Sequence, residues 1–120
     1  MRSKWIEHKG RTIFYQDFAK HFYNSAAVKA ELAEVQKIVI AESQNSVLVL
    51  SDMRDTNIGS DLLPAMNAAS AATKNHIRKT AVLGVTGMKR KLADLLTALT
   101  GQPLKYFDDI ESAKDWLVEE

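Results

Sequence analysis

The chain has 120 residues, of which 46% are hydrophobic and 26% charged, so it can form one compact domain but not two ordinary ones. Lysine and arginine number 16 against 15 for aspartate and glutamate, and the formal net charge of +1 gives no general electrostatic case for a nucleic-acid partner. Because cysteine is absent, disulfides, thiolate metal sites and cysteine nucleophiles are excluded.

The start of the chain, MRSKWIEHK, lacks the apolar centre of a signal peptide. No stretch of the sequence approaches the roughly 18 apolar residues that a bilayer-spanning helix needs. We therefore expect one domain over residues 1–120, located in the cytoplasm and without a transmembrane segment.

The N-terminal third predicts a hairpin followed by a helix. A polar turn at residues 7–11 lies between two short apolar segments, as in a β-hairpin. Asn24 or Ser25 can cap the helix that follows. Its apolar stripe has helical spacing, and the charged residues are expected mainly on the solvent side. The stripe consists of Val28, Leu32, Val35 and Val39, and the charged residues are Lys29, Glu31, Glu34 and Lys37.

The run Val47–Leu50 has no polar alternation, which predicts a strand buried on both faces in the interior of a parallel sheet. In open α/β sheets, the loop beyond the carboxyl end of a strand is the preferred place for a binding site. We therefore take the residues after this strand as a candidate regulatory or partner loop, with Asp52, Asp55, Thr56 and Ser60 as its candidate site residues.

After this loop, Ser60 or Asp61 can cap a second helix that runs roughly to Ile77, with Pro64 in its first turn. Residues 80–85 form a second uninterrupted apolar run and predict another interior strand.

Three more elements complete the chain. A leucine stripe over residues 92–99 predicts a helix closed by Gly101. Residues 103–107 predict a short edge strand, because Pro103 cannot donate to a ladder. Asp108 and Glu111 form a capping box for the last helix. The alternation of strands and helices predicts an α/β fold, a mixed, partly parallel sheet of four to five strands flanked by about four helices.

Nothing in the sequence favours catalysis. His8, His21 and His76 are scattered, without a metal-binding helix pair, and the Gly-x-Ser-x-Gly elbow of serine hydrolases is absent. We expect no enzymatic activity, no metal and no cofactor.

The turn after residues 80–85 offers a candidate anion site made of Thr86, Gly87, Lys89 and Arg90. Backbone N–H groups at a helix start, helped by the helix dipole, favour phosphate or carboxylate. The spacing, however, matches neither the P-loop nor the dinucleotide fingerprint. The alternative is a tight glycine turn followed by a solvated basic face.

Residues 48–54 are similar to the phosphoacceptor strand of response-regulator receiver domains, and Thr86 and Lys105 can pass for that family's threonine and lysine. Receivers also need a pair of acidic residues at the end of the first strand to hold Mg²⁺. The first strands here end in Glu7-His8 and Gln16-Asp17, without such a pair. A receiver-like phosphoacceptor is therefore the third alternative.

A second resemblance covers about residues 4–118. A Trp-x-x-His-x-Gly-Arg-x-Ile-x-Tyr-x-Asp pattern at residues 5–17 precedes a Leu-Val-Leu-x-Asp strand. Lys-Thr-Ala-Val-Leu-Gly-Val-Thr-Gly follows at 79–87, and Phe-Asp-x-Ile-Glu-x-Ala-x-x-Trp-Leu closes the chain at 107–117. The sequence resembles the SpoIIAA-like proteins of bacteria, which are related to STAS domains, the fold of anti-sigma-factor antagonists.

This resemblance implies a single STAS-like domain without enzymatic activity that docks to a partner protein. Some STAS domains bind nucleotides, lipids or other small apolar ligands. Regulatory members carry a phosphorylated serine in an Asp-Ser-Ser/Thr sequence, and residues 55–61 here lack the Asp-Ser pair. Ser60 keeps about the right place, where a helix dipole favours a phosphate and Asp61 opposes it. The alternative is that Ser60 is a simple N-cap.

We therefore expect a regulatory or binding module that docks another protein through the loop and helix after the central strand. The second interpretation is a carrier of a lipid or other small apolar ligand, and a homodimer is also open. A groove or dimer surface would be lined by aromatic residues and Met66, although such aromatics more often belong to the core. These aromatics are Phe14, Phe18, Phe22 and Tyr23.

Overall fold

The computed structural model describes residues 2–57, 59–85 and 103–119. One sheet contains five strands in the order β1-β2-β3-β4-β5. β1 is antiparallel to β2, and all the other neighbours are parallel. The sheet confirms the expected mixed, partly parallel α/β fold. The strands are β1 (Lys4–His8), β2 (Arg11–Asp17), β3 (Val47–Asp52), β4 (Ile77–Leu83) and β5 (Leu104–Phe107).

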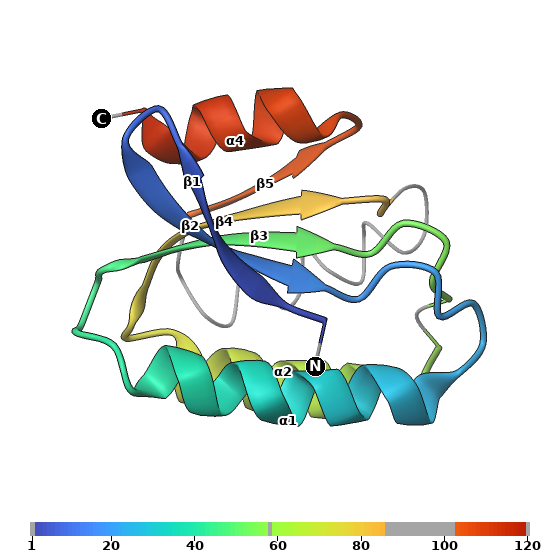
Figure 1. Cartoon of the computed structure of the whole chain (residues 1–120). Helices are drawn as coiled ribbons and strands as arrows, with labels where there is room; N and C mark the ends of the chain where they lie inside the picture. The colour runs from blue at the N-terminus through green and yellow to red at the C-terminus, as the bar shows by residue number, and fades with distance from the viewer. Residues whose placement is uncertain (1, 58, 86–102, 120) are drawn as a thin grey trace.

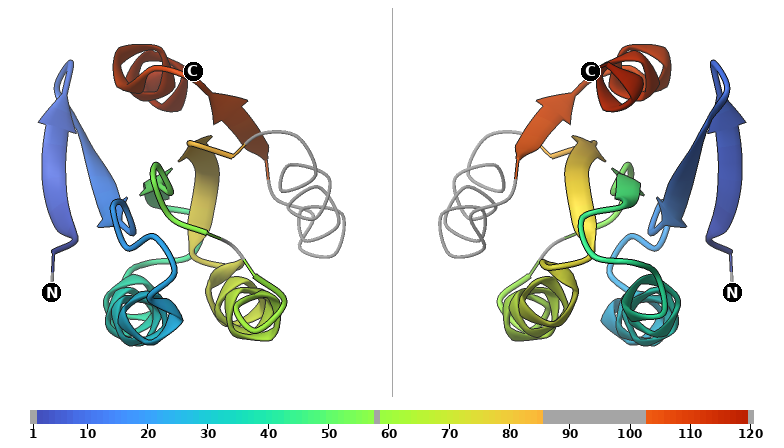
Figure 2. Two further views of the ribbon diagram at one scale, coloured as in Figure 1. Left: turned by 90° about the vertical axis from the view of Figure 1, so that its right-hand side faces the viewer. Right: turned by 90° about the vertical axis from the view of Figure 1, so that its left-hand side faces the viewer.

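Three described helices cover the two faces of the sheet. α1 (Ser25–Ile40) and α2 (Leu63–Thr73) lie side by side on one face, and α4 (Ile110–Val118) lies on the other (Figures 1 and 2). Each face has its own apolar cluster, built from Phe14, Val49 and Val82 on the α1–α2 side and from Ile13, Leu50 and Leu83 on the α4 side. The helix expected over residues 92–99 lies outside the described residues.

β3 is the central strand, and its sequence explains why. Val47, Leu48, Val49 and Leu50 are all buried, alternately in the two clusters. A strand with apolar side chains on both faces can be buried only between helices on both sides of the sheet. The expectation from the uninterrupted apolar run is confirmed.

The β1–β2 hairpin turns at Lys9 and Gly10, whose φ angles are 50° and 80°. Two consecutive residues at positive φ form a type I′ turn, which matches the twist of the flanking strands. The ladder then starts at the pair His8–Arg11 and continues to Lys4–Tyr15. The hairpin expected from the polar turn is confirmed.

α1 begins where expected, since Asn24 caps it by accepting a hydrogen bond from the N–H of Ala27. One expectation for this helix is wrong. The helical pattern predicts Glu31 on the solvent side with the other charged residues, but it is buried. Its carboxylate accepts hydrogen bonds from the N–H and Oγ of Ser3 at 2.9 and 2.5 Å, and from the N–H of Arg2. The partners come from 28 and 29 residues away, so helix periodicity could not reveal them.

α2 differs from its expected bounds at both ends. Neither Ser60 nor Asp61 caps it, because the N-cap position is Leu62, which makes no side-chain cap bond. The buried Leu62 side chain belongs to the core, and packing rather than capping places the helix start. The helix ends at Thr73 rather than near Ile77, which is instead the first residue of β4.

The last helix starts one residue later than expected. Asp109, not Asp108, is the N-cap, and its Oδ1 accepts from the N–H groups of Glu111 and Ser112. At the other end, the Nζ of Lys79 donates to the carbonyls of Trp116 and Glu119 at 3.0 and 2.8 Å. A cation at a helix C-terminus satisfies free carbonyls and complements the helix dipole. This contact ties α4 to β4.

The Glu31 contact predicts a measurable cost of removing one charge. Glu31→Gln should lower the free energy of unfolding by roughly 1–3 kcal/mol at pH 7, because buried donors of Ser3 lose a charged acceptor. Glu34→Gln is the matched control on the exposed side of the same helix and should change it by less than about 0.5 kcal/mol. Urea denaturation of both variants measures the difference, and an equal cost for the two would contradict the assignment.

The same contact predicts a pH dependence. Burial raises the pKa of the Glu31 carboxyl, but the hydrogen bonds from Ser3 and Arg2 outweigh burial and leave the pKa below its ordinary value. A carboxyl whose pKa is lower in the folded state stabilises the protein above its unfolded pKa, and this stabilisation is lost as pH falls through the folded value. The extra stability of the wild type over Glu31→Gln should therefore shrink in acid.

Candidate functional site

A buried carboxylate lies at the carboxyl end of the central strand. Asp52, the last residue of β3, has 0% of its surface exposed. Its Oδ2 accepts hydrogen bonds from the Oη of Tyr15 at 2.6 Å and from the Nη2 of Arg54 at 2.7 Å. Its Oδ1 accepts from the backbone N–H and the Nε of Arg54 at 3.1 and 2.9 Å. Both oxygens are therefore occupied by donors from β2 and from the loop after β3.

The three groups shift one another's protonation equilibria. Burial raises the pKa of the Asp52 carboxyl, but hydrogen bonds from Arg54 and Tyr15 outweigh burial and hold it below its ordinary value. Burial and the bond to Asp52 raise the pKa of the Tyr15 hydroxyl, and the bond to Asp52 raises that of the Arg54 guanidinium. At neutral pH the site is an ionised Asp–Arg pair with a neutral tyrosine donor. An enclosed carboxylate of this kind positions the chain and is poorly placed to accept a phosphoryl group.

Gly84 gives this site its close packing. It follows β4 with a φ of +83°, and a Cβ added there would lie 2.6 Å from the N and 2.7 Å from the Cα of Arg54. Only glycine lets the two backbones approach so closely. The N–H of Met53 also donates to the carbonyl of Leu83 at 2.9 Å. β4 therefore supports the loop that carries Arg54.

The segments that follow β2 and β3 remain joined to each other by backbone hydrogen bonds. We call these segments, residues 18–24 and 53–57, the paired loops. The N–H groups of Lys20 and Phe22 donate to the carbonyls of Arg54 and Asp55 at 2.8 and 2.9 Å. The N–H of Asn57 donates back to the carbonyl of Phe22 at 2.6 Å. The parallel pairing of the strands thus continues past their ends, and the rim of the sheet is well ordered by hydrogen bonds.

Thr56 closes the paired loops. Its side chain is buried, and its Oγ1 donates to the carbonyl of Phe18 at 2.5 Å while accepting from the N–H of His21 at 3.1 Å. Both hydrogen-bonding roles of the hydroxyl are therefore used inside the fold. Thr56 contributes to any site here by holding the loops, and its hydroxyl is not presented to a modifying enzyme in this conformation.

Three residues of the paired loops have unusual backbone angles. Lys20, Phe22 and Asp55 have φ values of 59°, 51° and 58°. A bulky residue such as phenylalanine rarely adopts positive φ, and such strain concentrates at functional sites. Here it accompanies two exposed aromatic side chains, since 60% of Phe22 and 84% of Tyr23 is accessible to solvent.

Of the four candidate residues in the loop after β3, two lie on the surface and two inside. Asp55 and Ser60 are exposed, whereas Asp52 and Thr56 are buried. Ser60 precedes α2 by three residues and is not its cap. The candidate anion-site residues Thr86, Gly87, Lys89 and Arg90 lie outside the described residues.

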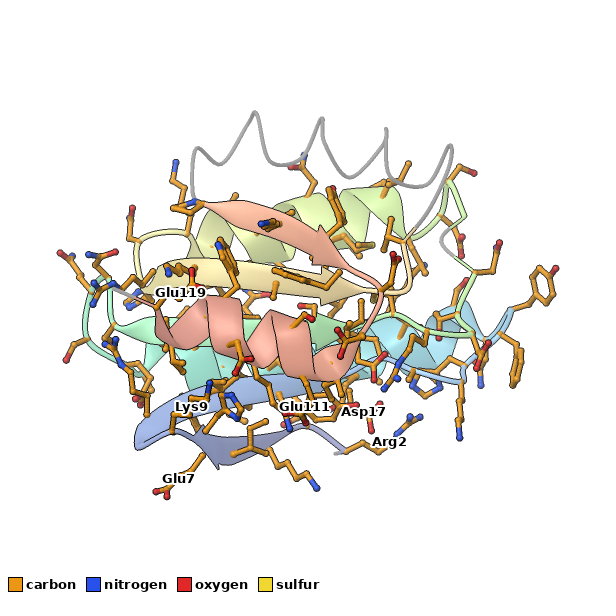
Figure 3. All side chains as sticks on the ribbon, turned by 90° about the horizontal axis from the view of Figure 1, so that it is seen from above. Arg2, Glu7, Lys9, Asp17, Glu111 and Glu119 are labelled. Carbon is orange, nitrogen blue, oxygen red and sulfur yellow. The ribbon has the colours of Figure 1, made fainter. Side chains whose placement is uncertain are left out.

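The histidines form no common site. His8 lies 2.6 Å from the Oδ1 of Asp115 in α4, His76 lies 2.8 Å from the carbonyl of Glu42, and His21 contacts Arg2. Arg2 also pairs with Asp17 at 2.8 Å, and Figure 3 labels both side chains. Within the part of the chain that the structure describes, no cluster of three or more metal-ligating side chains occurs. No helix among these residues is long and apolar enough to cross a membrane.

The family model of the SpoIIAA-like proteins matches residues 15–118, most of the chain. The chain belongs to the SpoIIAA-like family. This confirms the resemblance that the collinear motifs indicated, and the matched segment contains Tyr15, Asp52, Arg54 and the paired loops.

A solved structure supports the fold of this SpoIIAA-like chain. The chain is similar to an uncharacterized protein of the DUF3478 family with a SpoIIAA-like fold from Shewanella loihica PV-4, with a TM-score of 0.72. The two are 11% identical, and the alignment covers 96% of this chain and 91% of that chain. At this identity the likeness concerns the fold alone. No curated protein matches the chain.

The SpoIIAA-like sequence concealed several residues of this site. The pattern at residues 5–17 includes Tyr15 and the receiver-like segment 48–54 includes Arg54, but neither motif gives its residue a role. Alternation in β2 could have placed Tyr15 on the face opposite Phe14, but not against Asp52. Phe22 and Tyr23 were grouped with Phe14 and Phe18, whereas the structure buries the second pair and exposes the first. A positive φ at Phe22 has no signal in the sequence.

The contact between Gly84 and Arg54 yields a prediction with an internal control. Gly84→Ala should lower the free energy of unfolding by roughly 1–3 kcal/mol more than Gly10→Ala. Both glycines have φ near +80°, so the conformational cost is shared, but a Cβ at Gly10 meets nothing within 4 Å. Thermal and urea unfolding of the two variants measure the difference. Equal destabilisation would show that the close approach to Arg54 carries no weight.

Proposed function

We propose that this SpoIIAA-like chain is a non-enzymatic regulatory or binding module that docks another protein through the paired loops. The observation that carries the proposal is the exposure of Phe22 and Tyr23 on loops that are otherwise held by backbone hydrogen bonds. Aromatic side chains dominate the energetics of protein interfaces, and their exposure as a contiguous pair marks an interaction surface.

The paired loops are preorganised for binding by contacts within the chain. Thr56, the backbone bonds across the loops and the Asp52–Arg54 pair limit their conformational freedom. A rigid loop loses little entropy on binding, so more of the contact energy is available for affinity. The positive φ of Phe22 fits this interpretation, since the surrounding bonds hold the aromatic residue in a conformation that it would not choose alone.

The polar neighbours have the character of an interface rim. Lys20 and Asp55 are exposed and carry opposite charges, and the Arg54 side chain keeps 47% of its surface accessible while it is paired with Asp52. Interfaces commonly combine an aromatic centre with a polar rim that fixes orientation. In the expected site, Asp55 therefore contacts the partner, whereas Asp52 and Thr56 hold the surface in shape.

The other two interpretations of the sequence have less support. Receiver chemistry needs an accessible carboxylate, and the Asp52 side chain is enclosed by Tyr15 and Arg54. The carrier interpretation expects a groove lined by four aromatic residues, but two of them, Phe14 and Phe18, belong to the core. Phe22 and Tyr23 remain, and a pair of exposed rings favours docking over enclosure of a ligand.

The test is affinity capture from extracts of the source organism with variants of the paired loops. Phe22→Asn with Tyr23→Ser removes both rings, and asparagine tolerates the positive φ at residue 22. Ile40→Asn is the matched control, because Ile40 is also a partly exposed apolar residue, 47% accessible at the end of α1. A specific partner should be retained by the wild type and by Ile40→Asn, and its affinity should fall at least tenfold, about 1.4 kcal/mol, for the double variant.

Circular dichroism and thermal unfolding verify that both variants remain folded. A partner that binds the double variant as tightly as the wild type would remove the paired loops from the interface. Loss of the partner with Ile40→Asn as well would point to a surface that extends along α1.

A further inference from the structure

β1 is an outer strand of the sheet with one side unoccupied by any described strand. The strand order places it at the end of the sheet, and it pairs with β2 alone (Figure 2). Its five residues, Lys-Trp-Ile-Glu-His, include Trp5, which keeps 41% of its surface accessible although its ring lies 4.7 Å from that of Phe14. Glu7 extends past the outer edge of the strand (Figure 3).

The turn determines which backbone groups of β1 point outward. In a two-residue hairpin loop, the flanking residues His8 and Arg11 exchange hydrogen bonds, and bonded and non-bonded pairs then alternate. Ile6 and Lys4 therefore bond to β2, whereas Trp5 and Glu7 direct their N–H and C=O groups away from the sheet. The next residue with an outward N–H is Ser3. This N–H is not available to a second strand, since it donates to the carboxylate of Glu31.

We infer that the free edge of β1 binds β1 of a second copy of this chain in antiparallel orientation, so that the two sheets become continuous. In a two-fold arrangement centred on Ile6, Trp5 of one copy lies opposite Glu7 of the other. Within residues 2–57, 59–85 and 103–119, the outward groups of these two residues have no partner, so the copies exchange four hydrogen bonds. The outward donors and acceptors of one strand match those of the other in number and spacing, so neither strand has to change its conformation.

The side chains fit the same register. Ile6, which packs against the apolar cluster beneath α4, meets its own copy at the centre, where a non-hydrogen-bonded pair brings side chains closest. Lys4 lies opposite His8 of the second copy, beside the carboxylate of Asp115, which His8 contacts at 2.6 Å. Asp115 is 49% accessible, and its Oδ1 also contacts the Nζ of Lys9 at 2.9 Å, so Lys4 of the second copy approaches the other carboxylate oxygen, Oδ2.

Charge order along β1 selects a second copy over an unrelated strand. Lys4 lies near the start of the strand, and the carboxylate of Asp115 lies beside His8 at its end, on the same face of the sheet. Antiparallel pairing of two identical strands therefore sets opposite charges against each other at both ends. Charged residues on an edge strand usually prevent association. In this register Lys4 of each copy instead approaches the Asp115 carboxylate of the other, which favours a second copy over an unrelated strand.

The first test uses sedimentation velocity over a concentration series with variants of residue 7. Glu7→Pro removes an outward N–H and fixes φ, a change that an edge strand tolerates, while Glu7→Ala keeps that donor, and circular dichroism checks that both variants are folded. The wild type should form dimers reversibly, and the dissociation constant should rise at least about tenfold more for Glu7→Pro than for Glu7→Ala. A wild type that remains monomeric up to about 1 mM would overturn the inference.

The second test exchanges charges between copies. Lys4→Glu and Asp115→Lys should each weaken self-association, whereas an equimolar mixture of the two should form heterodimers with both charge contacts restored. Circular dichroism checks that each variant is folded. A mixture that associates no better than its components would overturn the register.

Amide hydrogen exchange separates this dimer from one formed by another face. The N–H groups of Trp5 and Glu7 should become protected as concentration rises, while that of Ile6 is protected at all concentrations by its bond to β2. A dimer in which Trp5 and Glu7 exchange as fast as in the monomer uses a different surface and contradicts the inference. The paired loops play no part in this contact, so its outcome is independent of the docking proposal.

Discussion

The enclosed carboxylate of Asp52 is the constraint on which the proposed docking edge of this molecule depends. An ionised group without solvent exposure costs several kcal/mol unless donors surround it. Here Tyr15 reaches it from β2, and Arg54 reaches it from the loop after β3 with both its backbone and its side chain. The hydrogen bonds to this one carboxylate therefore connect β2, β3 and the loop that follows β3.

The paired loops around Asp52 contain backbone conformations that are unfavourable for their residue types. Three non-glycine residues with positive φ, each costing on the order of 1–3 kcal/mol, persist only where neighbouring contacts determine the backbone. The contacts are the hydrogen bonds of Thr56, the backbone bonds across the paired loops, and the close approach of Gly84 to Arg54. Their result is a stiff rim that carries Phe22 and Tyr23 into solvent.

Local patterns in the sequence were enough for the layers of the fold and for its centre. An uninterrupted apolar run identified β3 because burial on both faces leaves no room for polar side chains. The polar turn identified the hairpin, and Asn24 marked the start of α1. Each of these features depends on residues close together in the chain, where spacing and residue type carry the physical information.

The features that escaped prediction depend on distant partners. Glu31 has the helical position of a solvated residue, and only the return of Ser3 to its side explains its burial. Arg54 follows a strand and has the charge of an ordinary exposed loop residue. Its role as a partner of a buried carboxylate follows from Asp52, which lies inside the sheet. Phe22 is exposed and has a positive φ, whereas its hydrophobicity alone favours the core.

The central claim, that the Asp52 charge holds the paired loops, is tested most directly by amide hydrogen exchange of Asp52→Asn. The amides of Lys20, Phe22 and Asn57, which bond across the loops, should exchange at least about tenfold faster in the variant, as for a local opening made easier by about 1.4 kcal/mol. The amides of Val47 and His76, at the opposite end of β3, should keep their rates. Unchanged exchange in the loops, or equal acceleration at both ends, would contradict the account.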